Sequence, residues 1–304
     1  MARLRQVSDR TDLGPLRDKM THYLPQSAGV RGFLDVLIMV EQKLETEVYI
    51  PESSGVSSLI VVTPSCSQEY IQSLTLFWDT EEEDDEEVVH LLKTLPGWDW
   101  TAPVYFRIHS VAIYTKVQEL MKKGSLGSNQ MWSNKVFDGA LYNLDISSLQ
   151  QFKIPEGFYL DSLHVQDGPT VASDWEYNWT ETRKGLESIM ANQPSVAIRK
   201  AVEKEGVSDA SDGSRLVAWS WLYRHGFQGN TFTIPEFRRR GLGTAATLAL
   251  AEKLRQLDIV VRIMVNHANT ASISYHQSLG FERQCDLISF IMLPDGKTLQ
   301  DYIK

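Results

Sequence analysis

The sequence predicts an α+β protein with two domains, residues 1–150 and 151–304. Strand-length segments rich in β-branched and aromatic residues alternate with segments whose apolar residues recur at helical spacing. A polar, proline-containing stretch over 147–157 interrupts this alternation near the middle of the chain and is typical of a linker. Since 42% of the 304 residues are apolar, each domain can build its own core.

In the first domain, apolar periodicity and turn residues define the expected elements. Helices are expected over 13–24, 30–43, 86–95 and 110–122. Strands are expected over 45–50, 58–63, 74–78, 104–108 and 135–144. Turns at 51–55 and 96–97 contain proline and glycine and separate neighbouring elements, and 124–130 is a polar loop.

The second domain shows a similar alternation. Strands are expected over 158–165, 196–202, 215–223, 228–234 and 258–265, with a last strand after Phe281. Helices are expected over 170–178, over 182–191, from Thr244 and after Asn269, and 203–214 is a polar loop. No fixed-period repeat is visible. The two domains nevertheless alternate strands and helices in a similar way, which suggests the hypothesis that the first domain is a degenerate copy of the second.

The most informative segment joins the strand at 228–234 to the helix from Thr244, and it reads Pro-Glu-Phe-Arg-Arg-Arg-Gly-Leu-Gly-Thr over 235–244. At a helix N-terminus, unpaired backbone N–H groups and the positive end of the helix dipole converge. Glycines let the backbone approach an anion closely, and arginines add positive charge. The segment predicts a cradle for a diphosphate, against the alternative of an ordinary basic turn before a helix.

A dinucleotide-binding site is the competing interpretation, because residues 241–246 also fit the pattern G-x-G-x-x-A. That site needs an apolar strand running directly into the first glycine and an acidic residue at the end of the next strand. Here Pro235, Glu236 and three arginines intervene, and Asp258 lies before the following strand. The context therefore argues against a dinucleotide-binding site.

A second motif supports the diphosphate cradle. Asn269 is a natural helix N-cap, and Leu-Gly-Phe over 279–281 ends the helix and leads into a strand. Together with the R-x-x-G-x-G spacing of Arg238, Gly241 and Gly243, this half of the chain resembles the GNAT superfamily of acyl-CoA-dependent N-acyltransferases. The resemblance narrows to the glycine N-acyltransferase-like branch on four short segments, 181–183, 194–195, 217–219 and 235–238.

The resemblance implies a GNAT fold, with a mixed, mostly antiparallel sheet flanked by helices and preceded by a second α/β domain. It implies acyl-CoA as a cosubstrate, no tightly bound cofactor, no metal, and acyl transfer to the amine of a small molecule, glycine or another amino acid. The alternatives are a protein N-acetyltransferase and a non-catalytic acyl-CoA-binding protein. The residues expected to bind acyl-CoA are Thr233, Ile234, Arg238, Arg239, Arg240, Gly241, Leu242, Gly243, Thr244 and Asn269.

Two residues are candidates for catalysis. Glu236 matches the glutamate that looks like the general base of the glycine N-acyltransferase family, and burial between strands would raise its pKa toward the working pH. Its alternative role is a loop carboxylate paired with Arg238 or Arg239. His276 occupies the position where many GNAT enzymes carry a tyrosine that protonates the leaving thiolate, and its alternative role is packing on the inner face of the helix. Tyr275, one residue earlier, would point about 100° away.

An amino-acid acceptor would require a cation for its carboxylate. Arg199, Arg215, Arg224 and His225 all lie on expected strands or hairpins, and the sequence does not choose among them. The net charge of −9 mildly favours a cationic amine and argues against a nucleic-acid partner.

Other sequence features limit where the protein is expected to be located and what it is expected to bind. No apolar run approaches membrane-spanning length, and two distant cysteines, Cys66 and Cys285, form neither a disulfide framework nor a metal cluster. Arginines near the N-terminus are interrupted by Asp9 and Asp12, unlike a mitochondrial presequence, so an intracellular, cytoplasmic protein is expected. The acidic run at 81–87 is expected to be a solvated loop leading into a helix.

Overall fold

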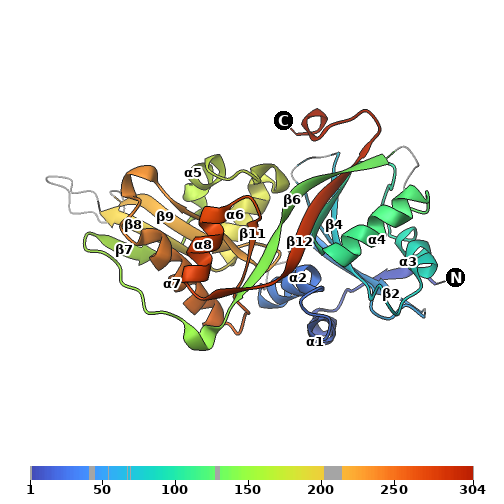
Figure 1. The fold of residues 1–304 in the computed structure, drawn as a ribbon, viewed down its shortest axis with the longest axis horizontal. Coiled ribbons are helices and arrows are strands. Elements are labelled where there is room, and N and C mark those ends of the chain that lie inside the picture. Colours follow the sequence, from blue (N-terminus) through green and yellow to red (C-terminus); the bar gives the residue numbers. More distant parts are fainter. Residues whose placement is uncertain are drawn as a thin grey trace.

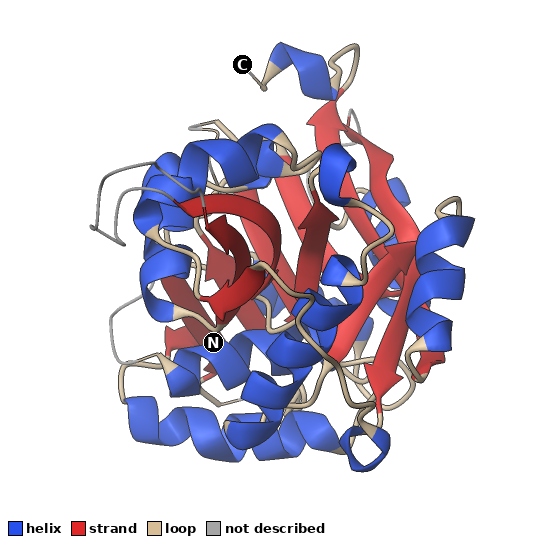
Figure 2. Ribbon diagram, turned by 90° about the vertical axis from the view of Figure 1, so that its left-hand side faces the viewer, coloured by secondary structure: helices blue, strands red, loops and turns tan. Residues whose placement is uncertain are grey.

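A computed structural model describes residues 2–40, 45–53, 55–66, 68, 70–126, 131–201 and 214–303. Its strands form an eight-stranded sheet and a four-stranded sheet. The sheets lie side by side along the long axis of the molecule, with the long strands β6 and β12 near its centre (Figure 1). Viewed from the end of the C-terminal half, the strands lie inside and the helices cover them on several sides (Figure 2). The predicted α+β class, with a mostly antiparallel sheet flanked by helices, is confirmed.

The described residues of the N-terminal half form ten main elements in the order strand, two helices, three strands, helix, strand, helix, strand. They are β1 (Leu4–Gln6), α1 (Leu13–Thr21), α2 (Ala28–Met39), β2 (Thr46–Pro51), β3 (Ile60–Pro64), β4 (Gln72–Phe77), α3 (Asp85–Leu92), β5 (Val104–Ser110), α4 (Val111–Lys122) and β6 (Met131–Leu144). A short 3-10 helix, η1 (Arg10–Asp12), precedes α1.

The C-terminal half repeats this order. Its main elements are β7 (Phe158–Asp161), α5 (Gly168–Ser173), α6 (Arg183–Asn192), β8 (Ser195–Ala201), β9 (Ser214–Leu222), β10 (Gln228–Thr233), α7 (Leu242–Gln256), β11 (Arg262–Asn266), α8 (Thr270–Ser278) and β12 (Phe281–Pro294). Short 3-10 helices are η2 (Ile146–Ser148), η3 (Val165–Asp167), η4 (Asn178–Thr180), η5 (Pro235–Phe237) and η6 (Leu299–Asp301). The shared order fits the hypothesis of a degenerate copy, and the boundary near residue 150 stays a prediction.

The last strands of the two halves are exchanged. The large sheet has the order β1-β2-β3-β4-β5-β12-β6-β11. Strand β12 of the C-terminal half therefore lies between β5 and β6 of the N-terminal half, and β6 in turn lies between β12 and β11. All these pairings are antiparallel except that of β4 with β5, which is parallel. The two halves thus share one hydrogen-bonded sheet.

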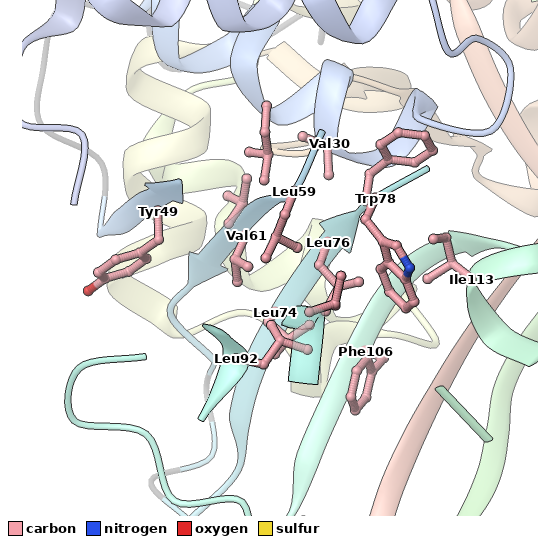
Figure 3. Packing of buried hydrophobic residues seen from close by; sticks show 14 of the residues in the cluster. Val30, Tyr49, Leu59, Val61, Leu74, Leu76, Trp78, Leu92, Phe106 and Ile113 are labelled. Carbon is pink, nitrogen blue, oxygen red and sulfur yellow. The ribbon is translucent and has the colours of Figure 1, made fainter. Parts of the chain in front are cut away.

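The core of the N-terminal half fills the space between its sheet and its helices. Leu74, Leu76 and Phe106 on the sheet and Ile113 on α4 are all at most 2% exposed, and Figure 3 shows them with Trp78 in one cluster. Burying a side chain of this size contributes about 1.5–3 kcal/mol. A separate cluster in the C-terminal half packs the apolar face of α7 against β8 and β9.

Helix α2 packs against the C-terminal half through a glycine. A Cβ atom on Gly32 would lie only 2.1 Å from the carbonyl oxygen of His225, in the turn between β9 and β10. Only glycine permits this approach of two backbones. Next to it, buried Asp35 of α2 forms an ion pair with Arg262 of β11 at 3.2 Å. The two halves are therefore joined by close packing and charge as well as by the shared sheet.

The acidic run at 81–87 has a structural role beyond the expected solvation. Asp84 caps α3 by accepting a hydrogen bond from the backbone N–H of Glu86 at 2.9 Å. Glu83 accepts hydrogen bonds from the backbone N–H groups of Ser57 and Ser58, both at 2.9 Å. The run thus fastens the loop before β3 to the start of α3.

The remaining differences from the sequence predictions are local. Strand β1 was not predicted, and β11 begins at Arg262 instead of 258, because Asp258 adopts a left-handed conformation with φ 55°. The predicted polar loop at 203–214 lies outside the described residues except for its last residue. Among the described helices, none is both long and apolar enough to cross a membrane.

Candidate functional site

The predicted cradle is an open helix N-terminus. Two of its residues, Arg239 and Gly241, have left-handed conformations with φ 64° and 79°, which turn the chain from η5 into α7. Gly241 is the N-cap of α7, and no side chain caps the helix. The backbone N–H groups of the first helical turn, at 242–244, therefore have no acceptor within the described part of the chain. Such a set of free N–H groups at the positive end of a helix is an anion site.

The three arginines of the cradle are exposed. Arg238 folds back on its own strand, donating from Nε to the carbonyl oxygen of Thr233 at 3.0 Å. The guanidinium of Arg240 lies 5.6 Å from the ring centre of Phe237. These contacts hold positive charge beside the helix N-terminus, where it adds to the attraction for an anion.

Gly243, the second residue of α7, has room for a side chain. A Cβ atom there would lie 3.4 Å from Oγ1 of Thr233 and 3.8 Å from the hydroxyl of Tyr275, which are ordinary contact distances. Glycine in a helix is less stable than alanine by about 0.5–1 kcal/mol. Folding therefore does not require this glycine.

Strand β10 leads from the cradle to a gap between the two sheets. Its other end carries a β-bulge, where the register against β9 shifts between Gly229 and Phe232 and Asn230 has φ 46°. Strand β10 is an edge of the small sheet and β11 is an edge of the large sheet, so the two are not hydrogen-bonded to each other. Bulges of this kind commonly lie beside active sites.

A cavity of about 300 Å³ occupies this gap. Residues 228–230 of β10 and 264–266 of β11 form two of its walls, and Asn269 and Ser272 of α8 lie beside them. The segment between α5 and η4 contributes residues 174–177. The N-terminal half contributes Tyr105, Arg107, Ile108 and Phe137. Both halves of the chain therefore build the cavity.

Three buried polar atoms of residues that line the cavity have no hydrogen-bond partner among the described residues. They are Nδ1 of His225, Oε1 of Gln228 and Nδ2 of Asn230, and all three residues line the cavity. Burial lowers the pKa of His225 to about 3, so its imidazole is neutral at pH 7. Because buried polar groups normally have partners, the cavity wall is unusual in holding three that have none among the described residues.

Asn269 is the N-cap of α8, as predicted, since its side chain accepts a hydrogen bond from the backbone N–H of Ser272 at 3.0 Å. It also lines the cavity. Thr233 and Ile234 lie along the path between cavity and cradle, at the end of β10 and directly after it. The predicted acyl-CoA residues thus lie at the end of β10, in the turn after it and at the starts of α7 and α8, and their binding role stays a prediction.

The expected burial of Glu236 is wrong. Its side chain is 64% exposed on η5 and pairs with Arg215 at 3.3 Å instead of with Arg238 or Arg239. The 3-10 turn carries Glu236 out of the sheet because Pro235 ends the strand. Glu236 does not line the cavity, where the carboxylates are Asp174 and Glu176. Its role as a base stays a prediction.

His276 is half-buried, and its ring lies 5.3 Å from that of Phe281. Nδ1 lies 2.8 Å from the carbonyl oxygen of Ser272, and burial lowers the pKa of the imidazole to about 4. A carbonyl only accepts, so Nδ1 carries the proton and the neutral ring has none to give from Nε2. This geometry favours the packing alternative over the acid, which stays a prediction.

Tyr275, the residue before His276, contacts α7 beside the cradle. Its hydroxyl lies 2.9 Å from Oγ1 of Thr247 on α7, close to Gly243. Oγ1 of Thr231 on β10 lies 3.5 Å from Oγ1 of Thr247, and the same Thr231 hydroxyl donates to Ser220 at 2.9 Å. A chain of hydroxyls therefore joins α8 to the bulged part of β10.

The four proposed acceptor cations are dispersed. Arg199 is buried between Asp161 and Asp167, at 2.6 and 2.7 Å. Arg215 pairs with Glu236 outside the cavity, and Arg224 is buried behind the cavity wall. Of the four, only His225 lines the cavity.

The sequence interpretation missed Arg107, which reaches the cavity from the other half of the chain. No local pattern marks Arg107. The bulge, in contrast, has a signal, since Gly229 inside a predicted strand is typical of a bulge. Among the described residues, no group of three or more histidine, cysteine or acidic side chains could hold a metal ion, and both cysteines are free.

Several solved structures have a similar fold. A Drosophila protein is 15% identical and aligns over 97% of this chain and 99% of its own, with a TM-score of 0.74. A tandem GNAT protein from the clavulanic acid biosynthesis pathway is 15% identical, with coverage of 98% and 100% and a TM-score of 0.56. The chain has a tandem GNAT fold. A GCN5-related N-acetyltransferase from Kribbella flavida has this GNAT fold too, at 14% identity, coverage of 91% and 96% and a TM-score of 0.54.

The comparisons by sequence match a smaller part of the chain. A family model described as FR47-like protein matches residues 206–287, which contain the cradle and the helix after Asn269. A search of curated proteins finds no match. The GNAT fold predicted from the two motifs is confirmed, and the narrower resemblance to the glycine N-acyltransferase-like branch stays a prediction.

Proposed function

We propose that this protein transfers an acyl group from acyl-CoA to the amine of a small molecule. The observation that carries the proposal is the connection of an anion site to a cavity by one strand. The first turn of α7 holds the diphosphate, β10 guides the pantetheine arm, and the thioester reaches the cavity at the bulge.

The reaction needs little more than positioning. The amine nitrogen attacks the thioester carbon, the carbon–sulfur bond breaks, the amine loses a proton, and the thiolate of coenzyme A takes one up. The backbone at the bulge and the polar side chains that line the cavity can orient the thioester carbonyl and the acceptor amine. Glu236 as base and His276 as acid remain the sequence-based assignment.

A small acceptor fits the cavity better than a protein tail. The volume of about 300 Å³ lies at the lower end of small-molecule sites. Glycine or another amino acid is the acceptor that the resemblance implies. A protein N-acetyltransferase would instead need an extended groove for a peptide.

Thiol release tests the proposal. The full chain is incubated with acetyl-CoA and longer acyl-CoA donors, together with free amino acids, arylalkylamines or peptides. We expect thiol release that depends on a small amine, and the product is identified by mass spectrometry. Binding of coenzyme A by calorimetry without turnover on any amine would indicate a non-catalytic acyl-CoA-binding protein, and preference for peptides would indicate a protein N-acetyltransferase.

A further inference from the structure

Three charged side chains are buried together beside the cavity. Arg107 of β5 pairs with Glu181 at 3.2 Å, and Arg224, in the turn between β9 and β10, pairs with the other carboxylate oxygen of Glu181 at 2.6 Å. All three are less than 10% exposed. Arg107 comes from the N-terminal half, and its two partners come from the C-terminal half.

The cluster has an unbalanced positive charge. Two guanidinium groups share one carboxylate, and the other acid near Arg224, Glu45, is half exposed and pairs with Lys184. A buried charge without a counter-ion costs several kcal/mol after relaxation. A bound anion would remove this cost, whereas an apolar ligand would not.

Arg107 is the member of the cluster that borders the cavity. Its Nε donates to Ser73, Nη1 donates to Glu181, and Nη2 donates to the carbonyl oxygens of Ser65 and Thr180. A guanidinium has five N–H groups, so one N–H of Nη1 is left for a ligand. Its other contacts fix its position, which makes it a pre-organised donor.

We propose that Arg107 holds an anionic carboxylate of the amine acceptor, so that the N-terminal half determines acceptor specificity. This inference rests on the proposed function. The carboxylate binds Arg107 at the bottom of the cavity, and the amine points toward the bulge of β10. The exposed carboxylates of Asp174 and Glu176, which also line the cavity, attract the ammonium end of an incoming acceptor.

Binding of product analogues tests this assignment independently of turnover. Affinities of the full chain for N-acetylglycine and N-acetylphenylalanine are compared by calorimetry with those for the corresponding amides, which have the same shape without the charge. A charge-assisted hydrogen bond contributes about 1.5–3 kcal/mol, so the wild type should bind at least one acid roughly tenfold or more tightly than its amide.

Arg107→Met should reduce this ratio to about one and leave affinity for the amide within about twofold. The variant should fold, because Glu181 then has one partner, Arg224, and the cluster becomes neutral. Arg283→Met removes an exposed arginine of β12 and should retain the wild-type ratio. If Arg107→Met does not fold, Arg107→Lys decides, since its shorter, single-headed cation should lower the ratio at least threefold.

An equal affinity of the wild type for acids and amides overturns the assignment, as does failure to bind any of them. A folded Arg107 variant with the wild-type ratio overturns it as well. Thiol release measured in parallel separates the two proposals. A preference for acids without turnover on any amine would leave Arg107 assigned and refute the acyltransferase. Turnover without a preference for acids would support the acyltransferase and refute the assignment of Arg107.

Discussion

The cradle makes a prediction at Gly243 in which stability and binding change in opposite directions. Replacement by alanine adds one methyl group at the second position of α7, where 3.4 Å separates it from the nearest atom. The folded protein should therefore gain about 0.5 kcal/mol, because alanine is the better helix residue and the first turn shows only part of the full effect. The melting temperature should rise by about 1–2 °C.

Coenzyme A should bind less tightly to the same variant. A phosphate oxygen must approach the backbone N–H groups to about 2.9 Å, and the added methyl group occupies that approach. Loss of one hydrogen bond to a charged group costs about 1.5–3 kcal/mol, which lowers affinity by tenfold or more. Calorimetry with coenzyme A and thermal unfolding without it measure the two effects separately.

Gly14→Ala is the matched control. Gly14 is also the second residue of a helix, α1, and its Cβ would meet nothing within 4 Å. It should show a similar gain in stability with unchanged affinity for coenzyme A. If Gly243→Ala is folded and binds coenzyme A as tightly as the wild type, the diphosphate does not contact this turn, and the position of the cofactor along β10 is wrong.

Three further predictions concern catalysis, acid stability and packing. Glu236→Gln should keep its affinity for coenzyme A but lower turnover near pH 7, with recovery as the pH rises and more amine is deprotonated; an unchanged pH–rate profile would leave Glu236 only its ion pair. The imidazole of His276 titrates near pH 6.5 in the unfolded chain but has a pKa of about 4 in the fold, so the unfolded state binds more protons between these values and stability falls as the pH drops through this window. Between pH 7 and pH 4.5, the free energy of unfolding measured with urea should therefore fall by about 2 kcal/mol less in His276→Gln than in the wild type; an equal fall in both would contradict this reasoning. Gly32→Ala should destabilise the fold by about 1–3 kcal/mol, since the new methyl group would lie 2.1 Å from a carbonyl oxygen; an unchanged urea midpoint would mean that α2 can move away without cost.

Much of the fold could be predicted because its signals are local. Periodicity located most of the helices and strands, and Asn269 was recognisable as an N-cap from its residue type and place. The cradle was predictable because glycine spacing and a helix start lie within ten residues of one another. Its free N–H groups follow from the absence of a capping side chain.

The interior of the site could not be predicted in the same way. Arg107 of β5 reaches the cavity because strands of both halves form one sheet beside it, and strand order leaves no local mark in a sequence. Glu236 was expected inside the sheet because it follows a strand directly, but a single 3-10 turn directs it to solvent. The neutral state of His276 depends on its burial in the fold, where its ring packs against Phe281 of β12, and residue type alone does not predict this burial.

The exchange of β6 and β12 has a consequence for the order in which the chain folds. One edge of β5 pairs with β12, which is synthesised about 180 residues later. The backbone N–H of Ile108, for example, donates to Oγ of Ser289 at a separation of 181 residues. Contacts this distant in sequence slow folding, and an unpaired strand edge is prone to association with other chains. While the polypeptide emerges from the ribosome, β5 and β6 therefore expose open edges until residue 294 has been made. The large sheet therefore cannot be completed before the last strand of the C-terminal half has been made.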